Sequence, residues 1–235
     1  MARAAFRLVF SLVVGTVAAM LFHEIPWFIK EVPGQTFVEP VSVSELALQL
    51  RVSSNDEDNL LADLIGAARE KLEVDTRRAF IARNFNLVMD QFPYWGQLDR
   101  QSIERTSQAT GVFYGGGVFM RRCPVSAVTQ IQYVDPSGTT KTLDPSEYSV
   151  DLVNEPIRIY PAYGLSWPIT RWQNNAITIT FTAGYSADSS KVPRLARQAI
   201  RLLATEWYWN REASAEDLSS YQTCVNALRW SGLPT

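Results

Sequence analysis

VPRLARQAIRLLATEWYWNRE, residues 192–212, is the stretch of sequence that decides the fold. The proline at position 193 suits the first position of a helix, where its missing N–H leaves no hydrogen bond unmade. Apolar residues then recur at helical spacing and form one face, which consists of Leu195, Ala199, Leu202, Leu203 and Trp207. The pattern predicts a long helix over about 193–211 whose apolar side is buried against the rest of the chain.

The same helix carries a basic side. Arg194, Arg197 and Arg201 are spaced at i, i+3 and i+7, so they share a face that differs from the apolar one. A solvated surface explains such a face, and so does contact with an anionic partner. The helix alone leaves both interpretations open.

Composition limits the possible functions. The chain has 235 residues, 46% of them hydrophobic and 20% charged, as in a globular protein. A net charge of −2 predicts no overall attraction to nucleic acid or anionic membrane, so any such attraction must be local. Cys123 and Cys224 lie far apart, and His23 is the only histidine. These counts argue against a disulfide scaffold, a zinc site and a histidine-based triad, so we expect neither an enzyme nor a cofactor.

The N-terminal part, residues 1–40, combines an apolar extension with a connector. Residues 4–22 are almost wholly apolar, with Arg7 the only charge, and are marginally long enough to span a bilayer. They also resemble a secretory signal without a clear cleavage site, or a helix buried in an assembly. Periodicity does not separate these interpretations. Prolines and a glycine between 23 and 41 predict an extended connector.

Residues 41–84 read as a helical part. Ser42 and Glu45 fit a capping box that opens a short amphipathic helix. Ser54 and Glu57 fit a second box before a longer helix with an apolar face of Leu61, Leu64, Ile65, Ala68 and Leu72. The acidic residues at 56–58 suit the first turn of that helix, so we do not interpret them as metal ligands.

Residues 85–185 read as an inserted antiparallel β unit, because the hydrophobic period changes to two. The clearest strand is 175–182, where isoleucines and a phenylalanine alternate with threonines. Further strands are expected within 85–89, 128–134, 140–143, 148–152 and 156–160. A long excursion at 94–120 ends in a Gly-Gly-Gly sequence that lacks the lysine of a P-loop. We interpret it as a flexible hairpin tip that contacts a partner, formed by Tyr114, Gly115, Gly116 and Gly117.

Residues 186–235 hold the C-terminal helices and a tail. A second helix is expected over 214–228, with Ser214 and Asp217 as its capping box. Its apolar stripe consists of Leu218, Tyr221, Val225 and Leu228. The last residues, 229–235, look like a tail that needs a partner to become ordered.

Taken in order, several short segments resemble the head–tail connector (neck adaptor) family of tailed bacteriophages and related phage-like particles. They are VSVSELALQLRV at 41–52 with the acidic 56–58, YVD at 133–135, YSVD at 148–151, IYPAYG at 159–164, WP at 167–168, ITFTAGY at 179–185, and VP at 192–193 with RQAIRLL at 197–203 and WYWNRE at 207–212. Together they span about residues 41–230. The apolar extension and the length of the 94–120 excursion depart from the family pattern.

The resemblance implies an α+β fold, a helical bundle formed by the N- and C-terminal helices with an inserted small antiparallel β subdomain. It implies a non-enzymatic structural protein of the virion neck, assembled in the host cytoplasm. Such a protein forms a homo-oligomeric ring, expected to be a dodecamer, under the portal. Its expected partners are the portal protein, tail or neck proteins, and double-stranded DNA that passes through the lumen without sequence-specific contacts.

Site residues follow as hypotheses. Arg194, Arg197 and Arg201 are candidates for the DNA channel, and Arg229, Trp230 and Leu233 for the portal contact, because the C-terminal segment of the resembled family reaches the portal. The alternative is a membrane-anchored binding module, in which residues 4–22 span the bilayer and an α+β soluble domain lies outside. A chain that sediments as a ring without detergent would exclude that alternative.

Overall fold

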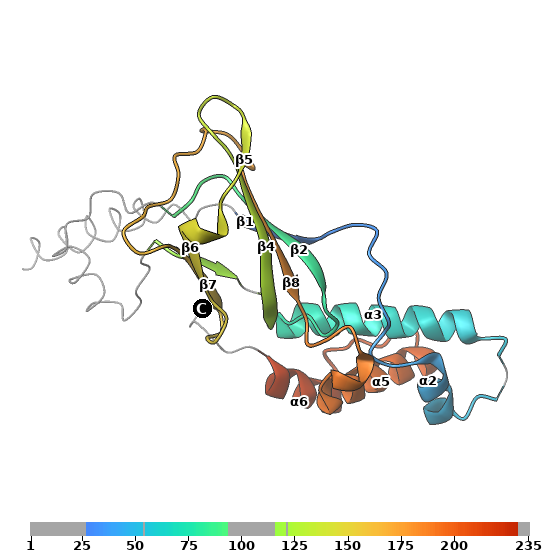
Figure 1. Ribbon diagram of the computed structural model, residues 1–235. Coiled ribbons are helices and arrows are strands. Elements are labelled where there is room, and N and C mark those ends of the chain that lie inside the picture. Colours follow the sequence, from blue (N-terminus) through green and yellow to red (C-terminus); the bar gives the residue numbers. More distant parts are fainter. Residues whose placement is uncertain (1–26, 54, 94–115, 121, 230–235) are drawn as a thin grey trace, which may run out of the picture.

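The computed structural model describes residues 27–53, 55–93, 116–120 and 122–229 (Figure 1). The apolar segment 4–22 lies outside these residues. The described part contains four α-helices and two antiparallel sheets, which confirms the expected α+β class. The helices lie together at one end of the molecule and the sheets rise from them, as Figure 1 shows.

The helices enclose a first hydrophobic core. Their bounds are α2 Val43–Leu50, α3 Asp58–Thr76, α5 Arg194–Trp209 and α6 Ser219–Leu228. α5 packs against each of the other three, which confirms that the 192–212 stretch is central. Its buried residues are Ala196, Ala199, Ile200, Leu203 and Ala204.

The predicted apolar face of α5 was partly wrong. Ala199 and Leu203 are buried as expected, but Leu195 is 39% exposed and Leu202 and Trp207 are only half-buried. The buried stripe is centred one residue further along, and three of its five residues are alanines. Because small side chains let helices approach closely, the alanines take the core positions and the larger side chains flank them.

One predicted helix start is confirmed and two were wrong. The Ser42 Oγ accepts from the Glu45 N–H, and the Glu45 carboxylate accepts from the Ser42 N–H, each at 3.2 Å. α3 instead begins at Asp58, with Glu57 as an N-cap that makes no side-chain capping bond, and the predicted cap Ser54 lies outside the described residues. α6 begins five residues later than expected, because the Ser214 hydroxyl caps a preceding turn by accepting from the Glu216 N–H at 3.2 Å.

The larger sheet has five strands in the order β1-β2-β8-β4-β5, and all of its pairs are antiparallel. The strands are β1 Trp27–Glu31, β2 Arg83–Met89, β8 Ile177–Ala183, β4 Val125–Val134 and β5 Thr140–Thr142. Residues 27–31 were predicted to be connector and instead form the edge strand. All five residues pair with β2, from Trp27 opposite Met89 to Glu31 opposite Phe85.

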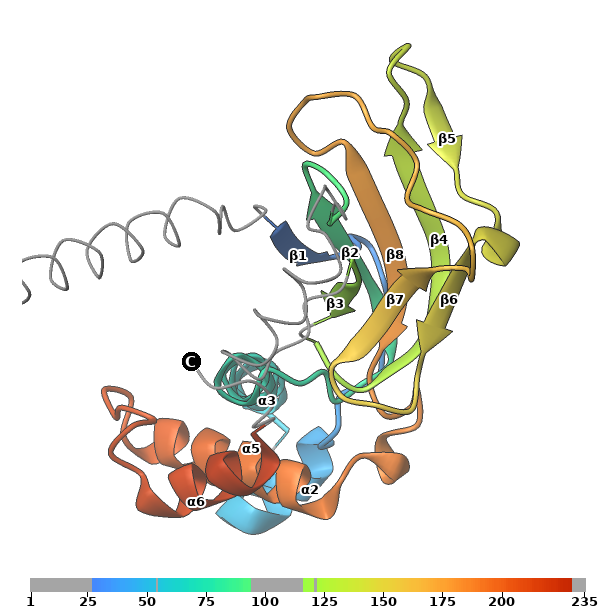
Figure 2. The ribbon, with the colours of Figure 1, turned by 90° about the vertical axis from the view of Figure 1, so that its left-hand side faces the viewer.

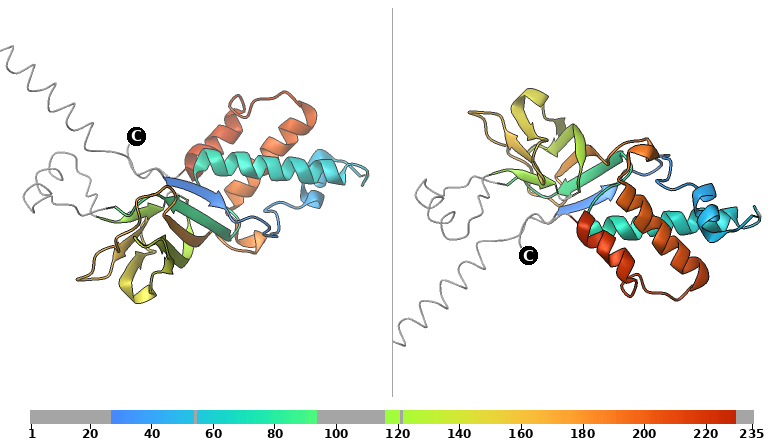
Figure 3. Two further views of the ribbon diagram at one scale, coloured as in Figure 1. Left: turned by 90° about the horizontal axis from the view of Figure 1, so that it is seen from above. Right: turned by 90° about the horizontal axis from the view of Figure 1, so that it is seen from below.

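The smaller sheet has three strands in the order β3-β7-β6. They are β3 Val118–Met120, β7 Ile157–Pro161 and β6 Tyr148–Asp151. Figure 2 shows this sheet beside the larger one. Alternate side chains of both sheets form a second core that includes Phe85, Ile131, Ile159, Ile179 and Phe181. Seen from above and below, the helices lie next to the sheets, with α3 in cyan beside the green strand β2 (Figure 3).

Candidate interaction surfaces

The three arginines of α5 do not form one free basic face. Arg194 is exposed, whereas Arg197 and Arg201 are half-buried. Arg197 forms an ion pair with Glu45 of α2, and the Arg201 guanidinium donates to the Gln198 side chain at 2.7 Å. Partial burial raises the pKa of Glu45. The hydrogen bond from the Ser42 N–H and the contact with Arg197 together lower this pKa by more than burial raises it, so the pKa lies below its ordinary value.

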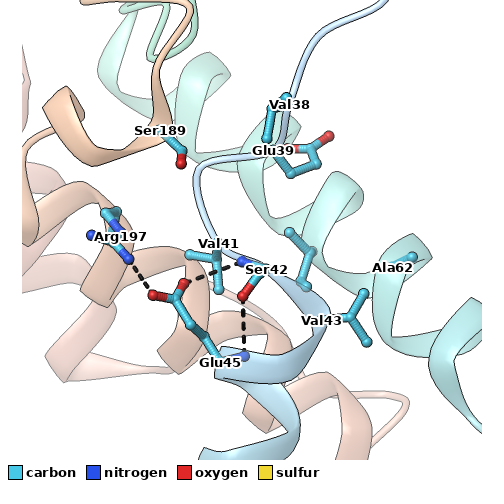
Figure 4. Close-up of a pocket in the computed structure, with 10 residues that line it drawn as sticks. Val38, Glu39, Val41, Ser42, Val43, Glu45, Ala62, Ser189 and Arg197 are labelled. Atoms are coloured by element: carbon cyan, nitrogen blue, oxygen red, sulfur yellow. Dashed lines mark hydrogen bonds and ion pairs between the residues drawn. The ribbon is translucent and has the colours of Figure 1, made fainter. Parts of the chain in front are cut away.

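A pocket of about 310 Å³ lies next to this ion pair, between α2, α3 and the 3₁₀ turn η2 Ser189–Lys191 (Figure 4). Its floor is apolar and includes the buried Val41 and Ile65. The carboxylates of Glu39 and Glu45 stand at its rim. Each has an arginine partner, since Arg69 contacts Glu39 at 2.9 Å and Arg197 contacts Glu45.

Two of the three glycines predicted to form a flexible, partner-contacting tip are buried. Gly116 and Gly117 are both buried, while Tyr114 and Gly115 lie outside the described residues. A Cβ at position 117 would stand 2.6 Å from the Tyr160 ring, so any larger residue there would require that ring to shift. The Gly116 carbonyl accepts the indole N–H of Trp167 at 2.6 Å. These two glycines therefore hold the chain where it enters β3.

Sequence reasoning missed an exposed apolar loop. The β7–β8 loop, residues 162–175, presents four large apolar side chains to solvent, which are Tyr163, Leu165, Ile169 and Trp172. Trp172 is 96% exposed. By contrast, Trp167 stacks on Phe92 with ring centroids 4.5 Å apart. Trp167 therefore fixes the loop to the second core, whereas Trp172 is exposed to solvent.

The end of α6 is tied to the rest of the subunit. The Arg78 guanidinium donates to the Leu228 carbonyl at 2.8 Å and forms an ion pair with Glu155. Arg229, one of the three portal candidates, donates its Nε–H to the Asp75 carbonyl at 3.1 Å. Trp230 and Leu233 lie outside the described residues. Arg229, the last described residue, is therefore attached near the C-terminal end of α3.

A buried charge cluster joins the two cores. Glu73 of α3 is 1% exposed and accepts from Arg69, Arg83 and Arg122, with N–O distances of 3.3, 2.5 and 3.0 Å. Arg83 belongs to β2, and its Nε lies 2.8 Å from Glu31 of β1. Burial lowers the pKa of Arg83. Glu73 and Glu31 together raise this pKa by more than burial lowers it, so the net shift is upward. The cluster fixes the helices to the larger sheet.

Neither a cluster of metal ligands nor a membrane-spanning helix is found among the described residues. Within them no group of three or more histidine, cysteine or acidic side chains could hold a metal ion. Of the acidic residues at 56–58, Glu57 accepts a hydrogen bond from the Tyr208 hydroxyl at 2.6 Å. In the same part of the chain no helix is both long and apolar enough to cross a membrane.

The fold is similar to solved structures of phage-like particles. No family model matches the chain, and no curated protein matches it. A chain in the neck of an empty gene transfer agent (GTA) particle, computed with C6 symmetry, superimposes with a TM-score of 0.67 at 22% identity. Chains in the virion of the native gene transfer agent particle and in its neck computed with C12 symmetry give TM-scores of 0.65 and 0.60, at 22% and 23% identity.

These similarities extend over nearly the whole of both proteins. In each of the three structures the match covers 88% of this chain and 97% of the other. The overall fold is therefore shared over most of this chain and nearly all of the other. The protein has the fold of a component of the neck of gene transfer agent particles, as its resemblance to neck connectors predicted.

Proposed function

We propose that this protein is a structural head–tail connector of a phage-like virion. In this function it forms a ring under the portal, extends the DNA channel and joins the tail. The single observation that carries the proposal is the shared fold, which covers 97% of a chain from a gene transfer agent neck. The proposed architecture of the subunit is a helical bundle with an inserted β subdomain. Its proposed location is the virion neck.

The symmetry of the similar structures supports a ring. Two of them were computed with C6 and C12 symmetry, so chains of this fold occur in assemblies around a central axis. A ring subunit must bury surface against its neighbours, and the exposed aromatic loop supplies such surface. The proposed partners are a second copy of this chain, the portal protein, tail or neck proteins, and DNA in the lumen.

Two surfaces are assigned within this function. Arg194, which is exposed, and Arg201 remain the channel candidates, whereas Arg197 is engaged with Glu45. Trp230 and Leu233 remain the portal candidates, because they come after the fixed end of α6 in the sequence. Gly116 and Gly117 are no longer candidates for a partner contact, since they are buried.

Electron microscopy of the purified full-length chain tests the proposal. We expect rings with a central hole, obtained without detergent, and with a symmetry that class averages reveal. Attachment to portal-bearing heads is the second readout. A chain that partitions into membranes and forms no ring would refute the connector and support the alternative, a membrane-anchored binding module.

A further inference from the structure

The β7–β8 loop displays its apolar side chains from a firm frame. The Arg171 N–H donates to the Val134 carbonyl at 2.9 Å, and the Asn175 N–H donates to the Asp90 carboxylate at 2.7 Å. Trp167 anchors the middle of the loop through Phe92 and Gly116. A loop that is already held in place loses little conformational entropy when it binds, so it is suited to recognition.

Its most exposed side chain has the chemistry of an interface anchor. Trp172 combines a large apolar surface with one N–H donor and lies almost entirely in solvent. Tryptophan is among the residues that most often dominate binding energy at protein interfaces, where it fills a pocket on the partner. From residue 162 to residue 175 the loop carries no acidic side chain.

The pocket between α2 and α3 matches such an anchor. Its 310 Å³ lies at the lower end of the range for ligand sites, which suits one aromatic side chain rather than a cofactor. The buried Val41 and Ile65 offer an apolar floor. Glu39 and Glu45 offer acceptors for an indole N–H, and because both have arginine partners, an entering ring leaves no charge unpaired.

The two surfaces lie at opposite ends of the molecule. Figure 1 shows the β7–β8 loop beside β5 at one end and α2 at the other, and the views in Figure 3 agree. A copy therefore cannot fill its own pocket with its own loop. A loop on one end that fits a pocket on the other end produces a head-to-tail contact, which closes into a ring when the rotation between copies allows it.

We propose that Trp172 of one copy inserts into the α2–α3 pocket of the next copy around the ring. This inference rests on the proposed function, which requires each subunit to present two different, complementary surfaces to its neighbours. The two surfaces are the β7–β8 loop and the pocket floored by Val41 and Ile65.

Two variants of the full-length chain test the contact from both sides. Trp172→Ala removes the anchor, and Ala62→Trp fills the pocket from an exposed position on its wall. Sedimentation velocity over a range of concentrations measures assembly. We expect each variant alone to weaken association about thirtyfold or more, the loss typical of a dominant anchor. Trp209→Ala, another exposed tryptophan, and Ala67→Trp, another exposed alanine of α3, are matched controls that should assemble normally.

A mixture of the two variants gives a sharper test. Trp172→Ala keeps an intact pocket and Ala62→Trp keeps an intact loop. In an equimolar mixture the loop of an Ala62→Trp chain can bind the pocket of a Trp172→Ala chain, and the remaining loop and pocket of that pair are both inactive. We expect that mixture to form heterodimers and nothing larger. An interface that does not join the surface of Trp172 to the surface of Ala62 does not predict this result.

The possible failures are distinguishable. Rings formed by Trp172→Ala at wild-type concentrations would overturn the Trp172 contact and leave the connector function intact. Variants that dissociate alone but form no heterodimer when mixed would also overturn the pairing of loop with pocket. A wild-type chain that stays monomeric at every concentration would overturn both the contact and the ring.

Discussion

Replacing Glu73 with glutamine should weaken the junction between the helices and the larger sheet. The Glu73 side chain is 2% exposed and accepts from three arginines as well as from the Phe80 N–H at 3.0 Å. Glutamine keeps the shape and one acceptor oxygen, but it removes the negative charge and presents an NH₂ group to guanidinium donors.

The expected loss of stability in Glu73→Gln depends on which carboxylate partners the three arginines keep. Removing one partner of a buried ion pair costs about 3–5 kcal/mol, because the other charge is left without compensation. Arg69 keeps Glu39 and Arg83 keeps Glu31, so we expect a loss near the lower limit, about 3 kcal/mol. Arg122 is the surplus charge, since burial and the neighbouring Arg83 already lower its pKa despite Glu73.

Urea unfolding followed by far-UV circular dichroism measures the loss, at a fixed concentration at which the chain is monomeric. Glu70→Gln is the matched control, because Glu70 contacts the same Arg69 at 3.3 Å but is 72% exposed, and such pairs contribute about 0–1 kcal/mol. Adding Arg122→Gln to Glu73→Gln should restore about 1 kcal/mol through the removal of the surplus charge. A loss from Glu73→Gln that equals the loss from Glu70→Gln would refute this account of the junction.

Four further predictions concern the helices and the proposed surfaces. Trp207→Ala should lower the free energy of unfolding in urea by about 2 kcal/mol, below the roughly 3–5 of a fully buried tryptophan, because Trp207 is half-buried and donates to the Ala213 carbonyl. The pKa of Glu45 is lowered in the folded state, so its contribution is present above pH 4.5 and is lost as the pH falls through the folded pKa. Glu45→Gln should therefore be less stable than wild type at neutral pH and converge with it in acid, and a gap that persists at pH 2–3 in melting experiments would contradict the assignment. Arg194→Glu should leave melting unchanged, because Arg194 is exposed, and should impair DNA retention in filled particles; normal infectivity would remove Arg194 from the channel. Deletion of residues 230–235 should spare the subunit's melting temperature and abolish attachment to portal-bearing heads, and wild-type recruitment would locate the portal contact elsewhere.

Regular periodicity made much of the fold predictable. β2 and β8 were expected because one face of each is apolar and the other polar, and their burial alternates as the pattern requires. β1 was missed because its position depends on pairing with β2, more than fifty residues away, and nothing local indicates that partner. Long-range pairing of this kind is determined by the packed sheet and not by a stretch of five residues.

The interaction surfaces were less predictable, because identical residue types have different environments. Trp167 and Trp172 lie five positions apart in one loop, yet the first stacks on Phe92 and the second is solvent-exposed. Arg69 and Glu73 have the i, i+4 spacing of an ordinary surface pair, yet both are buried. Only their contacts with Glu39, Arg83 and Arg122 reveal the difference.

The engagement of Arg197 with Glu45 bears on how DNA would pass through the proposed ring. Every phosphate that a protein neutralises adds to affinity through counterion release, so a helix with three free arginines in each of many subunits would bind DNA tightly. Tight binding opposes the movement of DNA through a channel. In this protein one of the three guanidiniums already has a carboxylate partner and another donates to a neighbouring glutamine, which leaves Arg194 as the most accessible charge on that side of α5. The arrangement favours weak, sequence-independent attraction, which is what a passage for DNA requires.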